Sequence, residues 1–466
     1  MLTGLIQPSE SCDRVIALAM FLKYNLYNIH SEVIIMMIEK ISIKNFRKFK
    51  ELNIEFAPQM NVIAGNNAAG KSSILEALAI GVGSFFLGIE AVPSPGIKKT
   101  DVRYIFRNTG SITERQPQFP VIIQCEGEVS GKKSTWLRSL NTESGGTTYG
   151  DAGQIKNIAS YIQKEIRNGN EDVILPLISY YGTGRLWAQK KEKQVDIASE
   201  FSNRFGGYVD CLSALSNEKL MIKWFKKMTM IQVQEETEIP ELTAVRTAIA
   251  ECYKSGDLIS SDVDVRYSLK SDELEIIYID KDGNKQKQPF HELSDGYKNT
   301  LSLVGDIAYR MAVLNPQLLG EVTKKTPGIV LIDVVDQHLH PLWQKNILRC
   351  LMQIFPKVQF VVTTHSPSII SSAINSNLIL LDNDGCHYYG RDAYGKDVNS
   401  VLYEIMGAGY RPDEIESKLR EFNDCLDKRD FEKAKNILDE LTDLLGEKNT
   451  DVVNAKIAYD FETIVL

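Results

Sequence analysis

The spacing of apolar residues near the start of the chain predicts β-strands. Between residues 38 and 56 apolar side chains recur largely at every second position, the period of a half-buried strand, so we expect two strands there. A third, continuously apolar strand over 60–64 leads directly into a loop that contains glycine. Residues 72–81 are rich in helix formers and end at glycine, as helices commonly do. The pattern therefore predicts a strand–loop–helix unit.

Later patterns predict an α/β protein with several parts. Residues 95–150 contain β-type runs, and residues 155–260 have a mainly helical pattern. Two continuous apolar runs, 328–333 and 358–363, are typical of central parallel strands. We divide the chain into an N-terminal extension (1–36), a first part of the α/β domain (37–154), a helical lobe (155–260), a second part of the α/β domain (261–410) and a C-terminal helical module (411–466).

Composition narrows the class of protein. A formal net charge of -8 over 466 residues argues against coating nucleic acid by bulk attraction, although a local basic stripe remains possible. The seven cysteines are scattered and form no C-x-x-C pair, which favours reduced thiols over disulfides or zinc. No apolar run reaches membrane-spanning length, and the N-terminus lacks the basic start of a signal peptide. We expect a cytoplasmic protein without a membrane partner.

The loop after the third strand matches G-x-x-x-x-G-K-[ST] in full. Its residues are Gly65, Asn66, Asn67, Ala68, Ala69, Gly70, Lys71 and Ser72, with Ser73 adjoining. The glycines let backbone N–H groups surround phosphates, and the following helix offers its positive end. We expect Lys71 to reach the β and γ phosphates and Ser72 to place its hydroxyl on Mg²⁺. A mere glycine turn is the simpler alternative.

Three further residues or motifs complete the candidate site. Asp333 follows the apolar run 328–333 and could hold Mg²⁺ through water, although a carboxylate after a strand is common. Ser294, Asp295 and Gly296 stand before a predicted helix over 299–313, either as an anion site or as a simple helix cap. His365 ends the second central strand, where it could contact the γ-phosphate or serve only in packing.

The order of these four motifs resembles that of the ABC-type AAA-family ATPases of the RecF, SMC and overcoming-lysogenisation-defect group. The resemblance covers roughly residues 37–410 and implies a P-loop ABC-type ATPase head with a mixed β region, a helical lobe insertion and the C-terminal helical module. It implies ATP and Mg²⁺ as cofactors. It also implies a head-to-head dimer or higher oligomer, in which Ser294 and Gly296 reach the γ-phosphate held by the opposite subunit.

Finer patterns are similar to those of the ATPase subunit of Septu-type antiphage systems, including versions linked to retrons. They are the run 180–187, the run from Asp336 to Trp343, and the tail from Arg411 to Gly446. This resemblance implies a separate HNH-type nuclease as partner, and also a retron reverse transcriptase with its RNA and DNA.

One position departs from the family pattern. Related chains place a glutamate directly after the acid at position 333, whereas this sequence has Val334. Valine cannot orient or deprotonate the attacking water, and losing a general base costs a factor of about 100 to 10,000 in rate. We therefore predict tight binding of ATP with slow or absent hydrolysis, unless Asp336, His338 or a partner group substitutes as base.

The sequence is also compatible with two other functions. One is a working DNA-repair ATPase of RecF type, and another is the nucleotide-binding subunit of a transporter. The basic residues Arg47, Lys48 and Lys50 stand where relatives contact nucleotide or DNA, but a solvated strand edge explains them equally well. A second basic group on the predicted helical lobe could form a nucleic-acid-binding face or an ordinary solvated surface. Its members are Lys190, Lys191, Lys193, Lys223, Lys226 and Lys227.

Overall fold

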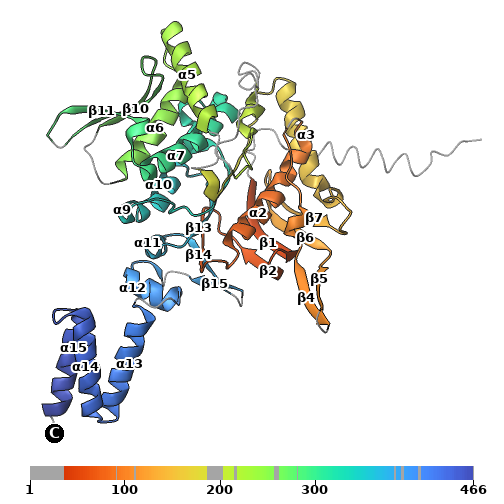
Figure 1. Cartoon of the computed structure of the whole chain (residues 1–466). Coiled ribbons are helices and arrows are strands. Elements are labelled where there is room, and N and C mark those ends of the chain that lie inside the picture. Colours follow the sequence, from red (N-terminus) through yellow and green to blue (C-terminus); the bar gives the residue numbers. More distant parts are fainter. Residues whose placement is uncertain are drawn as a thin grey trace, which may run out of the picture. The chain divides into compact units, whose positions relative to one another are not determined.

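The computed structural model describes residues 36–90, 92–109, 112–185, 203–214, 218–256, 262–280, 282–382, 385–389, 393–407 and 411–464 (Figure 1). The predicted N-terminal extension (1–36) lies outside these residues except for Met36, which begins the first strand. Lys190, Lys191 and Lys193 also lie outside them. The chain divides into two compact units, Met1–Gly395 and Lys396–Leu466, and each is described by itself. The second unit begins ahead of the helical module predicted from residue 411.

A six-stranded sheet forms the centre of the first unit. Its order is β15 (Cys386–Tyr389), β14 (Asn377–Leu381), β3 (Met60–Gly65), β13 (Val358–Thr364), β12 (Gly328–Ile332) and β8 (Leu177–Tyr181). The five strands from β14 to β8 pair in parallel, whereas β15 is antiparallel to β14. Strands β3, β12 and β13 are buried along their whole length, as their continuous apolar runs predict. Their carboxyl ends share one edge of the sheet.

A second, antiparallel sheet has the order β2 (Phe49–Glu55), β1 (Met36–Phe46), β6 (Val121–Val129) and β7 (Lys132–Leu140). Helix α2 (Lys71–Val82) contacts β6 and β7 of this sheet as well as β3, β12 and β13 of the central sheet. The indole nitrogen of Trp136 donates to the carbonyl oxygen of Gly81 at 2.9 Å, which ties β7 to the end of the helix. Helix α2 of the predicted strand–loop–helix unit therefore lies between the two sheets, and β3 is itself a strand of the central sheet (Figure 1).

The range 155–260 is less uniformly helical than the sequence predicts. Its described part contains most of α3 (Gly153–Arg167), together with α5 (Glu218–Gln234) and α6 (Pro240–Lys254). It also contains β8, which pairs with β12 in the central sheet. The prediction missed this strand because a five-residue apolar run fits a strand or a buried helix equally well.

The remaining elements of the first unit include two smaller sheets and several helices. A two-stranded hairpin joins β4 (Tyr104–Thr109) to β5 (Ile112–Pro117). A three-stranded sheet has the order β11 (Lys285–Pro289), β10 (Glu273–Ile279) and β9 (Val263–Ser268). The other helices are α7 (Asp295–Leu314), α8 (Val322–Lys325), α9 (Pro341–Gln344), α10 (Ile347–Ile354) and α11 (Pro367–Ser371).

One described segment, Lys71–Gly88, is long and apolar enough to cross a membrane by length and composition alone, and 78% of it is buried inside the protein. This segment contains α2, whose apolar character is explained by its position between the two sheets. It is a core helix.

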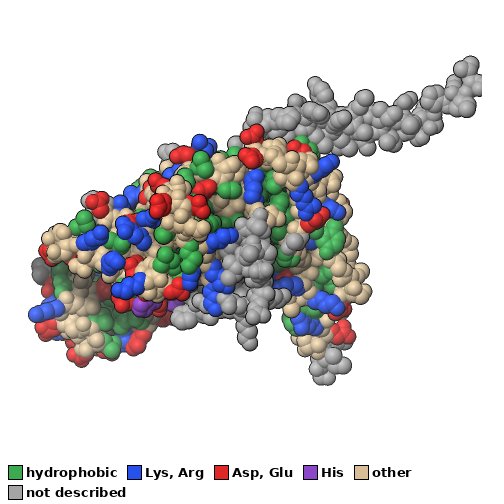
Figure 2. Space-filling view, turned by 90° about the horizontal axis from the view of Figure 1, so that it is seen from above, with side chains coloured by type: hydrophobic (Ala, Val, Ile, Leu, Met, Phe, Trp, Pro, Cys, Tyr) green, Lys and Arg blue, Asp and Glu red, His purple; other side chains and the backbone are tan. Residues whose placement is uncertain are grey.

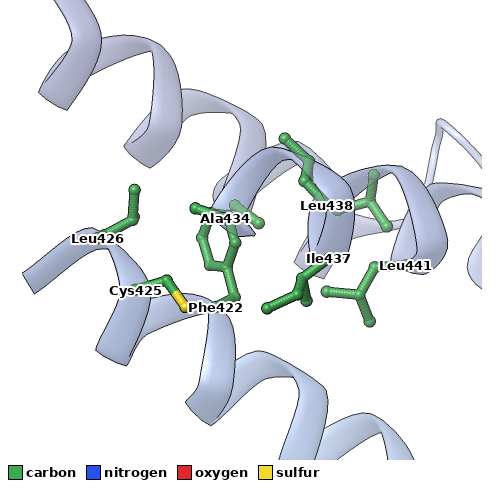
Figure 3. Close-up of a cluster of buried hydrophobic side chains, with 9 residues drawn as sticks. Phe422, Cys425, Leu426, Ala434, Ile437, Leu438 and Leu441 are labelled. Carbon is green, nitrogen blue, oxygen red and sulfur yellow. The ribbon is translucent and has the colours of Figure 1, made fainter. Parts of the chain in front are cut away.

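The second unit contains α12 (Val398–Ser400) and three longer helices, α13 (Asp413–Asp427), α14 (Phe431–Leu445) and α15 (Thr450–Ile464). Phe422 and Leu426 of α13 pack against Ala434 and Leu441 of α14 (Figure 3). Phe422 and Leu426 are four residues apart and Ala434 and Leu441 are seven apart, so each pair lies on one face of its helix. The helical character predicted for the C-terminal module is therefore confirmed.

Candidate nucleotide-binding site

The loop that follows β3 has the backbone needed to turn around phosphates. Gly65 and Gly70 have φ of 150° and 103°, and Ala68 between them has φ of 63°. A Cβ on Gly65 would lie 2.2 Å from the carbonyl oxygen of Leu381, and one on Gly70 would lie 2.5 Å from the Phe49 ring. The glycines are thus required by conformation and by space. Residues 66–68 between them are exposed.

Lys71 begins α2 and lies over this loop. Its ammonium donates to the carbonyl oxygens of Gly65 and Asn66, at 2.8 and 2.9 Å. Burial lowers the pKa of Lys71 to about 8, although the negative charges of Asp333 and Asp336 act in the opposite direction. Lys71 is therefore a buried cation beside two carboxylates, at the start of a helix that directs its N–H groups toward the loop. The next residues, Ser72 and Ser73, are partly exposed in the first turn.

Asp333 stands at the carboxyl end of β12 and is fixed by the neighbouring strand. Thr363 of β13 donates from its hydroxyl to Asp333 Oδ1 at 2.6 Å. The same hydroxyl accepts from the backbone N–H of Val334 at 2.8 Å. Only 2% of Asp333 is exposed, so this hydrogen bond sets the direction of a buried carboxylate. One threonine thus positions both residues that follow the strand.

His365 and Asp336 complete the group around Lys71. His365 Nδ1 lies 3.4 Å from the Lys71 ammonium. Burial, helped by the positive charge of Lys71, lowers the pKa of His365, so the ring is neutral at pH 7. Asp336 Oδ1 accepts from the Thr364 hydroxyl at 2.6 Å. Residues from three separate parts of the sequence therefore meet at one edge of the central sheet.

Val334 directly follows Asp333, at the position for which the family resemblance predicts a glutamate. Its φ is 51°, a left-handed conformation that a β-branched residue rarely adopts. Two hydrogen bonds hold the turn, from Val334 N to Thr363 Oγ1 and from Val335 N to the Thr363 carbonyl at 2.9 Å. The backbone at Val334 is therefore fixed, and the valine side chain offers no proton acceptor.

The segment Ser294–Gly296 lies at the start of α7. Ser294 is the N-cap residue, without a side-chain capping hydrogen bond, and both Ser294 and Asp295 are exposed. A Cβ on Gly296 would lie 2.4 Å from the carbonyl oxygen of His338, and Asn299 donates to the Gln337 carbonyl at 3.0 Å. The segment is therefore packed against residues 337–339, which follow Asp333 and Asp336 in the chain.

The structure adds residues whose role the sequence left open. Arg47 ion-pairs with Glu76 of α2 and with Asp101, the latter at 2.9 Å. Its guanidinium also donates to the Ser73 hydroxyl at 3.4 Å. Lys48 donates to the Ala68 carbonyl in the phosphate loop at 3.1 Å. Both basic residues thus support the loop; the sequence signal was their place in the K-N-F-R-K run.

The donor set suits magnesium held together with a nucleotide. Within the described residues, no group of three or more His, Cys, Asp or Glu side chains could hold a metal by itself. Mg²⁺ commonly uses one or two protein oxygens together with phosphates and water. The Ser72 hydroxyl and the Asp333 carboxylate supply protein oxygens of that kind.

Comparisons with known proteins agree with this geometry. A family model described as an AAA domain matches residues 40–256. A second AAA-domain model, associated by its description with AbiEii toxin and Type IV TA systems, matches residues 212–371. The first contains Lys71, and the second contains Ser294, Asp333 and His365. The fold and the site define a P-loop ATPase of the AAA class.

Curated relatives narrow the class. The chain is 26% identical to "Retron Ec83 probable ATPase" of Escherichia coli, over 90% of this chain and 85% of that protein. It is 24% identical to "Retron Vc95 probable ATPase" of Vibrio cholerae, over 74% and 73% of the two chains. It is 33% identical to Septu protein PtuA of Bacillus thuringiensis, over 37% and 45%. The chain is therefore similar to retron ATPases and to Septu PtuA, and AAA-domain models match its residues 40–256 and 212–371.

Solved structures with a similar chain path include an SMC head bound to the C-winged helix domain of ScpA. It has a TM-score of 0.45 at 16% identity and covers 76% of this chain and 98% of its own. The recombination mediator RecF has a TM-score of 0.41 at 14% identity, over 78% and 100% of the two chains.

Proposed function

We propose that this chain is an ATP-gated assembly subunit of an antiphage defence complex. The retron and Septu relatives support the defence role. The arrangement of Lys71, Asp333 and His365 supports binding of a triphosphate with Mg²⁺. In this proposal the nucleotide acts mainly as a ligand that controls assembly.

Slow hydrolysis follows from one observation, the aliphatic side chain of Val334. A general base must lie within hydrogen-bonding reach of the attacking water. Val334 supplies none, and Thr363 fixes the backbone that carries it. Asp336 is the nearest substitute in the sequence, but the Thr364 hydroxyl already binds one of its oxygens. The bound nucleotide would then persist long enough to hold an assembly together.

Assembly would proceed by pairing of two heads. The loop at Lys71 of one subunit would hold the triphosphate, and Ser294 and Gly296 of the other would close over it. An exposed Ser294 at the start of a 20-residue helix supports this arrangement. We further propose a cytoplasmic complex with a separate HNH-type nuclease, together with a retron reverse transcriptase and its RNA and DNA.

ATP turnover tests the proposal most simply. We expect the purified chain with Mg²⁺ to turn over at least about 100-fold more slowly than its Val334→Glu variant, because glutamate restores a base. Val334→Gln is the matched control, with similar size and no base, and should stay slow. ATP affinity should remain similar in all three proteins. Brisk turnover by the unaltered chain would refute slow hydrolysis and favour a working repair ATPase.

A further inference from the structure

The hairpin β4–β5 presents two chemically different faces. Its register pairs Tyr104 with Pro117, Phe106 with Arg115 and Asn108 with Thr113, and these residues share one face. The other face carries Ile105 with Gln116 and Arg107 with Glu114. Within the described hairpin, the first face has aromatic and basic residues but no carboxylate. The only described acid of the hairpin, Glu114, lies on the opposite face.

The first face exposes an aromatic ring beside a stacked guanidinium. Phe106 is 66% exposed, an unusual position for a large apolar side chain. The guanidinium carbon of Arg115 lies 3.6 Å from the centre of the Tyr104 ring, close enough for stacking. Phe106 lies two residues from Tyr104, so both rings stand on the same side of the strand. The face therefore offers flat π surfaces next to a positive charge.

Basic residues gather around this hairpin in an acidic protein. Segments 44–50 and 98–117 together carry nine basic and two acidic residues, against a net charge of -8 for the whole chain. Exposed members include Lys44, Lys50, Lys98 and Lys99. Over the surface shown in Figure 2, basic and acidic side chains are largely interspersed. The excess of positive charge is thus a local feature of these two segments.

Hydrogen bonds join the two segments to each other, and Lys48 of the first segment donates to the Ala68 carbonyl in the phosphate loop. Arg103, which precedes the hairpin, donates from its backbone to the Asn45 carbonyl at 2.9 Å. Gln118, which follows the hairpin, donates to the Arg103 carbonyl at 2.8 Å. The side chain of Asn45 donates to the Pro120 carbonyl at 3.0 Å. The base of the hairpin is thus fixed to the turn that carries Arg47 and Lys48.

We propose that this hairpin face, formed by Tyr104, Phe106 and Arg115, binds single-stranded nucleic acid. Unpaired bases present their π faces and would stack on the exposed rings, while the surrounding lysines and arginines neutralise phosphates. A duplex buries its π faces in its own base stack and gains only the phosphate contacts. A protein partner is less well matched, because apolar docking surfaces are poor in charge at their centre. The proposal does not depend on the ATP-dependent pairing proposed above.

Fluorescence anisotropy on the full chain tests the proposal. The probes are a labelled mixed-sequence DNA strand of about 20 nucleotides, longer than one small binding domain occupies, the same sequence as RNA, and its DNA duplex. We expect at least one single strand to bind about tenfold more tightly than the duplex. Comparison of the DNA and RNA strands identifies which source of unpaired bases is preferred. No binding, or equal affinity for duplex and single strands, would overturn the proposal.

Substitutions separate stacking from charge and from apolar contact. We expect Phe106→Leu to weaken single-strand binding about tenfold and Phe106→Tyr to retain it, because tyrosine keeps a ring. Arg115→Gln should weaken binding several-fold more than its charge-matched control, Arg107→Gln, on the other face. Unchanged binding in Phe106→Leu, or equal losses at both arginines, would contradict the assignment of this face. ATP affinity should stay unchanged in every variant, so this test fails or succeeds independently of the assembly function.

Discussion

The ammonium of Lys71 lies 3.4 Å from Nδ1 of His365, although 294 positions separate them in the sequence. The two residues follow β3 and β13, which are neighbours in the central sheet and run in parallel. Burial lowers the pKa of both side chains, and the positive charge of Lys71 lowers the pKa of His365 further. Lys71 is therefore a partly desolvated cation, which favours binding of a polyanion at this site.

The lowered pKa of Lys71 predicts how ATP binding depends on pH. Without nucleotide this pKa is about 8, and a bound triphosphate will raise it because opposite charges favour the protonated form. Below pH 8 the lysine is already charged, so its contribution to affinity is constant. Above pH 8 binding must take up a proton, and affinity should fall by up to about tenfold per pH unit. Titration calorimetry from pH 7 to about 9.5 measures this slope.

Lys71→Arg provides the control for this titration, because arginine stays charged over the whole range. Its ATP affinity should be nearly independent of pH above 8, even if it is weaker overall. The same steep decline in both proteins would assign the effect to another group.

The two hydrogen bonds of the Thr363 hydroxyl predict that one substitution will affect both the folding stability and the magnesium-dependent binding of ATP. Its hydroxyl contacts both Asp333 Oδ1 and Val334 N, so Thr363→Val removes one buried and one partly buried hydrogen bond. We expect a loss of about 1–3 kcal/mol in unfolding free energy, measured by urea denaturation. We also expect weaker binding of ATP in the presence of Mg²⁺, because Asp333 loses the group that orients it.

Thr326→Val is a suitable comparison for that variant. Thr326 is equally buried, and its hydroxyl accepts from Asn315 at 3.2 Å. It lies ahead of β12, at the end of the strand opposite Asp333. The variant should lose stability without a selective loss of magnesium-dependent binding. If both threonines affect nucleotide binding equally, Thr363 has no specific role at the site.

Much of the candidate site follows from the sequence because it depends on strand ends. Lys71, Asp333 and His365 each follow a continuously apolar run, and parallel strands bring their carboxyl ends to one edge. The loop motif is equally local, since its glycines fix the turn. The position of these groups could therefore be predicted without knowledge of the intervening chain.

Other features depend on tertiary context. Strand β8 is a short apolar run within a mainly helical pattern, and only its pairing with β12 distinguishes it. The ion pairs of Arg47 depend on left-handed backbone at Asn45 and Arg47, and residue propensity does not predict this conformation for an arginine. The left-handed Val334 is likewise invisible in the sequence, where only the missing glutamate is apparent.

In the proposed dimer, ATP joins two heads through Lys71 of one subunit and Ser294 of the other, and a mixing experiment tests this arrangement. Lys71→Ala should lose the phosphate cradle, and Ser294→Arg should block the closing surface. In a mixed pair, one of the two composite sites retains both Lys71 and Ser294. Sedimentation with Mg²⁺ and ATP should show monomers for each variant alone and dimers for their mixture. Dimers of Ser294→Arg alone, or a mixture that stays monomeric while the unaltered chain dimerises, would contradict the account.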